Sequence, residues 1–137
     1  MAELTGNAAT RLGGRFIALG ALVMALAVIF SAAGDHLVAS RVSAEDLHIY
    51  DIANRFQIYH GLGLLFIGVL IRQYGKRRLL YAAGGLMTLG TLLFCGGLYL
   101  LTLTGDVSWA FFAPVGGITL VLSWLSLALS MWRASAT

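Results

Sequence analysis

Charged residues are scarce in this sequence: Asp, Glu, Lys and Arg together make up 11% of its 137 residues. Soluble globular domains carry roughly 25% charged residues, so this composition lies well outside that class. Hydrophobic residues make up 59% of the chain, and the mean hydropathy is +0.86. A chain this apolar is typical of a protein embedded in a lipid bilayer.

Cysteine and proline are almost absent, with one residue of each. The single Cys95 excludes a disulfide within the chain and a metal site built on cysteine spacing. Because Cys95 lies in an apolar stretch, we predict that it is a small, buried apolar residue. Pro114 stands near the start of the last apolar stretch, where a missing backbone amide costs a helix little.

Motifs of catalysis and of nucleic-acid binding are also lacking. No serine has a histidine and an acid at a spacing typical of hydrolases, and no glycine loop precedes a helix in a phosphate-binding pattern. The net charge is +3 and the pI is about 9.4, but the basic residues flank apolar stretches rather than forming one face or a tail. We therefore expect neither an enzyme nor a nucleic-acid-binding protein.

Four stretches without a charged residue are present, and a membrane-spanning helix needs about 20 apolar residues. The second stretch is the shortest, but Ser43-Ala44-Glu45-Asp46 upstream of it resembles a capping box, in which Ser43 accepts from the amide three residues later. We therefore start the second helix there. The stretches are 16–34, 56–71, 79–105 and 107–132, and the helices they predict are about 16–35, 44–72, 79–103 and 114–132.

The connections between these helices are short, so we predict one all-α membrane domain over residues 16–133. Its expected architecture is a bundle of four transmembrane helices with up-down antiparallel topology. Residues 1–15 are polar and predict a loosely ordered lead-in. A signal peptide, with its h-region at 16–30 and a cleavage site near 31–33, is the alternative for the first helix, which we expect to be retained.

Small residues predict where the helices pack, because lipid gives helices no hydrophobic drive to associate and close backbone contact must hold them together. We expect Ala21 and Ala25 of the first helix and Gly61 and Gly68 of the second to lie in such contacts.

The basic residues predict the orientation of the bundle. Seven of the nine stand in the N-terminal segment, in the connection after the second helix, and at the C-terminus. The opposite side carries two basic residues against five acidic ones. By the positive-inside rule, we expect a multi-pass protein of the bacterial inner membrane with both termini on the cytoplasmic side. The seven are Arg11, Arg15, Arg72, Lys76, Arg77, Arg78 and Arg133.

The few polar residues at membrane depth are the candidates for a site. Asp35 and His36 end the first helix, and Gln57, Tyr59 and His60 stand where the second is expected to enter the hydrocarbon. Because the two helices are antiparallel, we expect His36 and His60 to lie at a similar depth and to face each other. Ionisable groups at such a depth are costly and often functional.

Three interpretations of this cluster stay open. Asp35, His36 and His60 could bind copper, zinc or iron, or the two histidines could hold a haem. The same groups could instead form hydrogen bonds between helices, with Tyr99 completing the cluster, or contact a small molecule or lipid headgroup. Arg55 lies on the polar face of the second helix and is a candidate partner contact.

Several segments resemble landmarks of a known family. They are Gly34-Asp35-His36-Leu37, Gln57-Ile58-Tyr59-His60, residues 89–99 (LGTLLFCGGLY), and Trp109-Ala110-Phe111 running into Pro114-Val115-Gly116-Gly117. Together, over roughly residues 15–132, they resemble the domain of unknown function 423 family, which includes the transmembrane protein 256 of animals.

The resemblance implies four helices in a membrane, and it offers no catalytic residues to carry over because the biochemical role of the family is not established. The sequence departs from the family pattern at Asp35, where alanine is usual, and at Ser31, where glycine is usual. The extra acid beside His36 suggests a member adapted to a metal or to a partner.

The functional hypotheses follow from these observations. The first is an accessory or assembly subunit of a larger membrane complex, whose partners are membrane lipid and other membrane-protein subunits and which needs no cofactor. The second is a metal- or haem-binding membrane protein using His36 and His60. The third is a small carrier or channel formed by a homo-oligomer.

Overall fold

A computed structural model describes residues 2–75 and 77–135, with side chains from residue 10 onward. Within this part the chain is all helical and contains no strand, which confirms the all-α prediction. Four long helices follow one another, with one short helix after α1 and another before α4. Their bounds are α1 Ala2–Ala33, the π-helix η1 Gly34–Val38, α2 Ala44–Tyr74, α3 Arg78–Thr104, the 3₁₀-helix η2 Val107–Phe111 and α4 Phe112–Ser135.

The lead-in expected to be loosely ordered is helical instead, because α1 begins at Ala2. The segment contains no proline, and tertiary packing of its last turns supports the helix where local propensity is weak. Gly13 is buried against α2, where a Cβ atom would lie 2.7 Å from the carbonyl oxygen of Gly68. Contact between α1 and α2 therefore continues beyond the apolar stretch from which the first helix was predicted.

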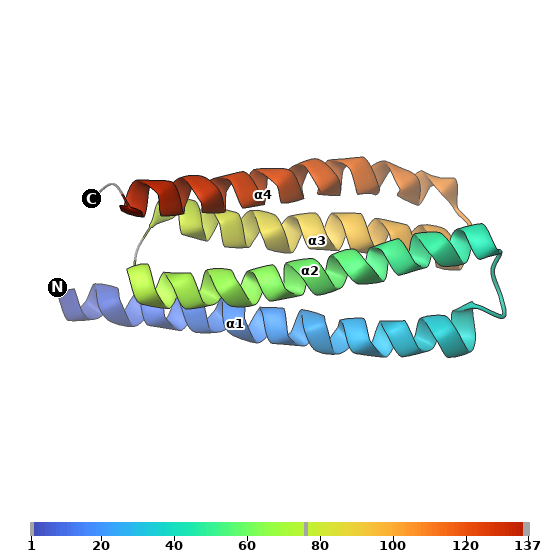
Figure 1. Cartoon of the computed structure of the whole chain (residues 1–137), viewed down its shortest axis with the longest axis horizontal. Coiled ribbons are helices and arrows are strands. Elements are labelled where there is room, and N and C mark those ends of the chain that lie inside the picture. The colour runs from blue at the N-terminus through green and yellow to red at the C-terminus, as the bar shows by residue number, and fades with distance from the viewer. Residues whose placement is uncertain (1, 76, 136–137) are drawn as a thin grey trace.

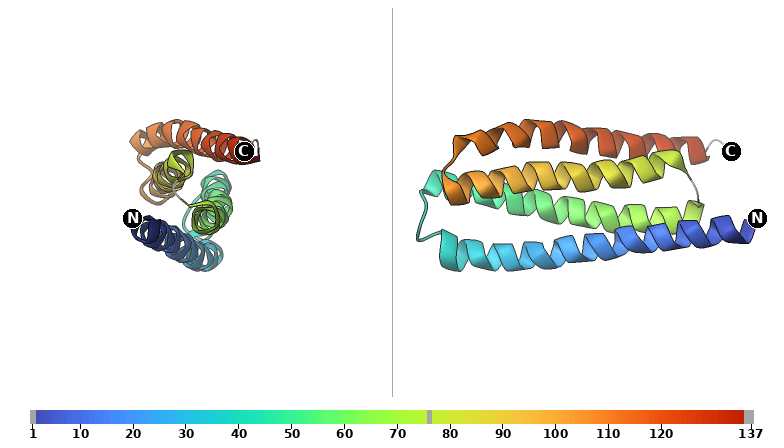
Figure 2. Two further views of the ribbon diagram at one scale, coloured as in Figure 1. Left: turned by 90° about the vertical axis from the view of Figure 1, so that its left-hand side faces the viewer. Right: turned by 180° about the vertical axis from the view of Figure 1, so that it is seen from behind.

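Each long helix runs antiparallel to the next (Figure 1). Extensive contacts join α1 to α2, α2 to α3 and α3 to α4, so the helices pack in chain order. The end-on view in Figure 2 shows the four helices stacked in a zigzag with α1 and α4 at its two ends. The helix α2 is therefore central, because it packs against both α1 and α3.

Three segments are long and apolar enough to cross a membrane: Thr10–Val38, Arg78–Thr104 and Val107–Ser135. The central helix α2 is equally long but is not among them. Its polar side chains, which include Asn54, Arg55, Gln57 and His60, lower its hydropathy, and three of these four are buried within the protein.

The contact between α1 and α2 is built on small residues repeated every seven positions. The buried positions Gly13, Gly20 and Ala27 of α1 follow this spacing, and Gly34 at the start of η1 continues it. A Cβ atom at Gly20 would lie 2.8 Å from the carbonyl oxygen of Gly61, so the two backbones touch there. A seven-residue repeat keeps one stripe of an α-helix facing its partner along its length.

Two of the four small residues predicted to lie in helix contacts do so. Gly61 and Gly68 are buried against α1, as expected. The prediction for Ala21 and Ala25 is wrong, because both are exposed. Ala21 comes one position after Gly20 and Ala25 two positions before Ala27, so both lie on another face of α1.

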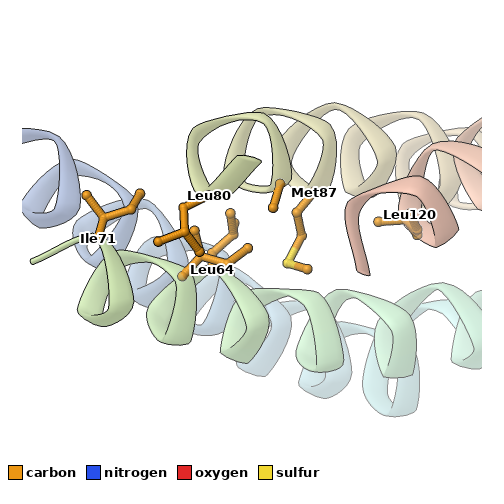
Figure 3. Packing of buried hydrophobic residues seen from close by; sticks show 7 residues of the cluster. Leu64, Ile71, Leu80, Met87 and Leu120 are labelled. Atoms are coloured by element: carbon orange, nitrogen blue, oxygen red, sulfur yellow. The ribbon is translucent and has the colours of Figure 1, made fainter. Parts of the chain in front are cut away.

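An apolar core packs the helices α2, α3 and α4 against one another. Figure 3 shows Leu64 and Ile71 of α2 facing Leu80 and Met87 of α3, with Leu120 of α4 in the same cluster. A further contact joins α3 to α4, because the buried Ser123 hydroxyl donates to the carbonyl oxygen of Ala83 at 2.7 Å. Gly116 fits directly against the backbone of Phe94.

The turns follow from local chemistry. The Ser43 hydroxyl caps α2 by accepting from the Asp46 amide at 3.1 Å, which confirms the predicted start of this helix. Gly105 ends α3 in the left-handed region at φ 69°, which favours glycine. The Asp106 carboxylate then accepts from the Ser108 amide at 2.9 Å, and hydrogen bonding to Ser108 holds the pKa of Asp106 below its ordinary value.

We predict that Gly20→Ala destabilises the protein by about 1–3 kcal/mol, the usual cost of overpacking. The added methyl group would lie 2.8 Å from the Gly61 carbonyl oxygen and 2.9 Å from the Leu65 amide nitrogen, and neither backbone atom can move away cheaply. The measurement is the free energy of unfolding in detergent micelles, followed by tryptophan fluorescence.

Gly14→Ala is the matched control on the same helix, because no atom lies within 4 Å of its added Cβ. Alanine favours a helix over glycine by about 1 kcal/mol, so this control should be neutral or stabilising. Equal responses from the two variants would show that Gly20 does not hold the helices in contact.

Candidate functional site: a buried polar network

The structure does not bring the predicted ligands together. Asp35 and His36 are exposed in η1 beside the start of α2, whereas His60 is 5% exposed and lies well along α2. At 1.5 Å per residue, His36 and His60 are about 20 Å apart along the bundle. Among the described residues, no group of three or more His, Cys, Asp or Glu side chains could hold a metal ion. The predicted pairing of His36 with His60 is therefore wrong.

The physical reason is the register of α1 against α2. The connection between η1 and α2 is short, so the residues level with His36 are those at the very start of α2. Hydrogen bonds fix the same register further on: the Tyr50 hydroxyl donates to the Phe30 carbonyl at 2.7 Å. The expectation of equal depth rests on the charge-free part of the second helix, which begins only at Phe56.

His60 has an aromatic environment instead of a metal-binding one. Its Nδ1 lies 2.7 Å from the Phe56 carbonyl oxygen, and because a carbonyl can only accept, Nδ1 carries the proton. The imidazole ring stacks on Phe56 at a centroid distance of 5.8 Å and lies 6.1 Å from the Trp124 ring. His60 thus links α2 to α4 through ring contacts.

The polar side chains that do meet are Asn54, Gln57 and Tyr99, and we call them the polar network. The Tyr99 hydroxyl donates to Gln57 Oε1 at 2.8 Å and accepts from Asn54 Nδ2 at 3.3 Å. Two backbone carbonyls of α1 complete the network, because Asn54 Nδ2 donates to Ala27 at 2.8 Å and Gln57 Nε2 donates to Val23 at 2.9 Å. The network therefore ties α1, α2 and α3 together.

The position of the polar network differs from the expected cluster near one end of the helices. Val23 and Ala27 lie in the middle of the candidate span Thr10–Val38. Asn54 is 7%, Gln57 5% and Tyr99 8% exposed, so the side chains are shielded by the protein itself.

Aromatic rings enclose the polar network. The Tyr99 ring meets Phe30 edge-on at 5.1 Å and Tyr50 at 4.8 Å between centroids. Cys95 belongs to the same buried cluster and is a free thiol, which confirms the prediction that it is buried. A hollow of about 160 Å³ borders the network on the side of α1 and α3, and Gln57, Cys95 and Tyr99 line part of it.

The sequence identified part of this network. Gln57 and Tyr99 were candidates and do hydrogen-bond each other. Tyr59 is 57% exposed and Arg55 is also exposed, so neither joins them. Asn54 was missed, although its spacing of three from Gln57 places the two amides on one helix face, which is the signal that could have found it.

The chemistry of the polar network is that of a clamp between helices. Its side chains are neutral amides and a phenol, and each side-chain donor given above reaches an acceptor in the same chain. The two carbonyls on α1 also fix the orientation of both amide groups, because only their NH₂ ends can face a carbonyl oxygen. What the arrangement can do is hold three helices in one register.

We predict that Tyr99→Phe destabilises the protein by about 0.5–2 kcal/mol, because it leaves the buried Gln57 Oε1 without a donor. A double-mutant cycle with Gln57→Leu should give a coupling free energy of about 0.6 kcal/mol or more. Unfolding in detergent micelles measures both quantities.

Tyr59→Phe is the control for Tyr99→Phe, since it removes the same hydroxyl oxygen from a tyrosine of α2 that is exposed. A coupling near zero between Tyr99 and Gln57 would contradict the clamp.

Comparison with known proteins places the chain in a family. Residues 30–117 match the family described as "Protein of unknown function (DUF423)". A UPF0382 membrane protein of Staphylococcus saprophyticus is 35% identical over 118 residues, which cover 86% of this chain and 97% of the relative. Another, from Bacillus subtilis, is 30% identical over 115 residues, covering 84% of this chain and 94% of the relative. No solved structure matches the chain. The resemblance noted from the landmark segments is thus confirmed, and the chain belongs to the DUF423 family of membrane proteins.

Proposed function

We propose that this protein is a non-catalytic accessory or assembly subunit that docks on other membrane proteins through the outer face of α1. All four long helices cross a bacterial inner membrane in this proposal, and both termini lie on its cytoplasmic side. The observation that carries the docking role is a second stripe of small residues on α1, distinct from the one that faces α2.

The second stripe, which we call the outer stripe, follows alternating steps of four and three residues along α1. Gly14, Ala18, Ala21 and Ala25 occupy it, and the last three are exposed. Nothing lies within 4 Å of a Cβ atom at Gly14, so the stripe is open on that side. Small residues in a membrane helix allow a second helix to approach closely, as Gly20 and Gly61 already do on the other face.

The position of α1 in the zigzag supports the same role. The helix packs extensively against α2 alone among the long helices, and only 11% of the residues in its most apolar window are buried. Large apolar side chains such as Val28 and Ile29, which are 67% and 59% exposed, extend the apolar surface beyond the outer stripe. A helix of a partner subunit could therefore lie along α1 without disturbing the clamp.

The non-catalytic part of the proposal is supported by the chemistry of the buried groups. Asn54, Gln57 and Tyr99 bond to one another and to backbone carbonyls, and His60 uses its Nδ1 proton on Phe56. Groups held in this way are arranged for helix packing and not for proton transfer to a substrate.

We predict that Ala21→Leu with Ala25→Leu releases the chain from its partner complex, because the larger side chains keep a second helix from approaching. Native mass spectrometry of protein extracted gently from its own membrane should show wild type bound to other subunits and the variant alone. Ala128→Leu is the control, because Ala128 is also an exposed alanine but lies on α4.

Unfolding measurements on the same samples should show both leucine variants as stable as wild type, since none of these alanines is buried. Wild-type chains that leave the membrane without another subunit would overturn the docking role. A complex of identical copies would favour the homo-oligomeric carrier or channel instead.

The four-span orientation predicts which positions face outward. In a Cys95→Ala background, a membrane-impermeant maleimide applied to intact cells should label Ser40→Cys, in the exposed turn after η1, and Ser108→Cys, in the exposed helix η2 at the same end of the bundle. Thr10→Cys and Ser135→Cys lie at the other end and should react only after lysis. If only three helices crossed the membrane, Thr10→Cys and Ser135→Cys would react from opposite sides.

A further inference from the structure

A second polar feature lies at the end of the bundle where α3 begins and α4 finishes, away from the polar network. Here a hollow of about 180 Å³ opens between the two helices. This volume is below the range of about 300–1,000 Å³ that drug-sized ligands occupy, so the hollow suits a small group. The residues that line it are Arg77, Arg78, Leu79, Ser130 and Arg133, and we call it the arginine hollow.

Ser130 is the unusual residue of the arginine hollow. It is 2% exposed, and its Oγ is the one buried side-chain nitrogen or oxygen in the described part of the chain that has no hydrogen-bond partner. A buried hydroxyl without a partner is rare in folded proteins and costs stability, so a bound group that accepts from Ser130 would explain the hydroxyl at this position.

Other hydroxyls in the same helices show what Ser130 could have done. Hydroxyl side chains in α3 and α4 commonly donate to the carbonyl oxygen four residues earlier, which satisfies them within their own helix. Ser130 does not follow this pattern, so its hydroxyl is free to bind a group within the hollow. The residues that follow the pattern are Thr88, Thr91, Thr104, Thr119 and Ser126.

The charges around the arginine hollow are of one sign. Arg77, Arg78 and Arg133 line it, and no acidic residue is among its described lining residues. The amino-terminal end of α3 adds a partial positive charge at the same place, because the dipoles of its peptide groups align. Arg77 precedes this helix in an extended conformation, and its side chain makes no capping hydrogen bond, so the first amides of α3 have no side-chain cap.

We propose that the arginine hollow binds a phosphate group, with the arginines and the end of α3 neutralising its charge and the Ser130 hydroxyl donating to one of its oxygens. Guanidinium groups and helix N-termini are both suited to phosphate oxygens. The inference requires only that the chain lies in a membrane, and not that it serves as a subunit.

The position of the arginine hollow favours the phosphate of an anionic lipid headgroup over free phosphate. It stands where the candidate spans Arg78–Thr104 and Val107–Ser135 reach the same end of the bundle. Trp132, which is 78% exposed, lies beside Arg133 in sequence, and tryptophan is enriched at the level of lipid headgroups. Basic pockets between membrane helices are typical headgroup sites.

The test is a titration of the full-length protein in a non-ionic detergent, followed by native mass spectrometry. Phosphatidylglycerol should bind at least about tenfold more tightly than phosphatidylcholine with the same acyl chains. Arg78→Gln with Arg133→Gln should weaken phosphatidylglycerol binding about tenfold. The control Arg15→Gln with Arg72→Gln also removes two positive charges from this end of the bundle, but outside the hollow. It should change phosphatidylglycerol binding less than about twofold.

Ser130→Ala separates the hydroxyl from the charges. It should weaken phosphatidylglycerol binding about fivefold while leaving the unfolding midpoint of lipid-free protein unchanged or slightly raised, because the hydroxyl has no partner to lose. A lowered midpoint with unchanged lipid binding would show that Ser130 serves packing alone, and would overturn its role in the site.

Inorganic phosphate distinguishes the two sources. Failure of millimolar phosphate to displace phosphatidylglycerol supports a lipid site, whereas phosphate binding that is lost in Ser130→Ala supports the same chemistry with a soluble anion. Equal loss of binding in the hollow variant and in the two-charge control would overturn the site, because surface charge alone would then explain the preference.

Discussion

The close contact between α1 and α2 is the constraint on which the rest of the structure depends. Lipid does not drive two apolar helices together, so their association rests on how closely the backbones approach. Gly20 and Gly61 meet without side chains between them, and Gly13 and Gly68 repeat the contact two turns further along. Any larger residue at these positions would separate the helices and move every contact that depends on their spacing.

The polar network follows from that spacing. Asn54 and Gln57 reach carbonyl oxygens of α1 at 2.8 and 2.9 Å, which is possible only because small residues hold the two backbones close. Tyr99 then joins α3 to a pair of helices that is already in register. A buried amide in an apolar environment is costly unless it is bonded, so the network penalises any shifted register in which these groups would lack partners. Small residues thus set the distance between the helices, and polar residues set their register.

Local features of the fold could be predicted from the sequence, whereas the register between helices could not. The start of α2 follows from the capping chemistry of Ser43, and the existence of the long helices follows from the apolar stretches. The predicted meeting of His36 with His60 rests on the charge-free part of the second helix, but the absence of charge does not indicate depth when a polar side chain faces a neighbouring helix. Asn54 illustrates this, because it lies among the polar residues before that stretch and yet is buried level with Ala27.

The two stripes of α1 show how one helix can serve two contacts. Residues spaced by seven from Gly13 face α2, while the offset positions Ala18, Ala21 and Ala25 face outward. Both sets are small, yet only the first is needed to hold this chain together. Replacing the outer alanines with larger apolar residues would bury more surface in lipid at no cost to internal packing, so the fold does not require their small size, and the proposed contact with a further helix would account for it. The fold does not require the hydroxyl of Ser130 either, because it contributes no hydrogen bond within the described part of the chain.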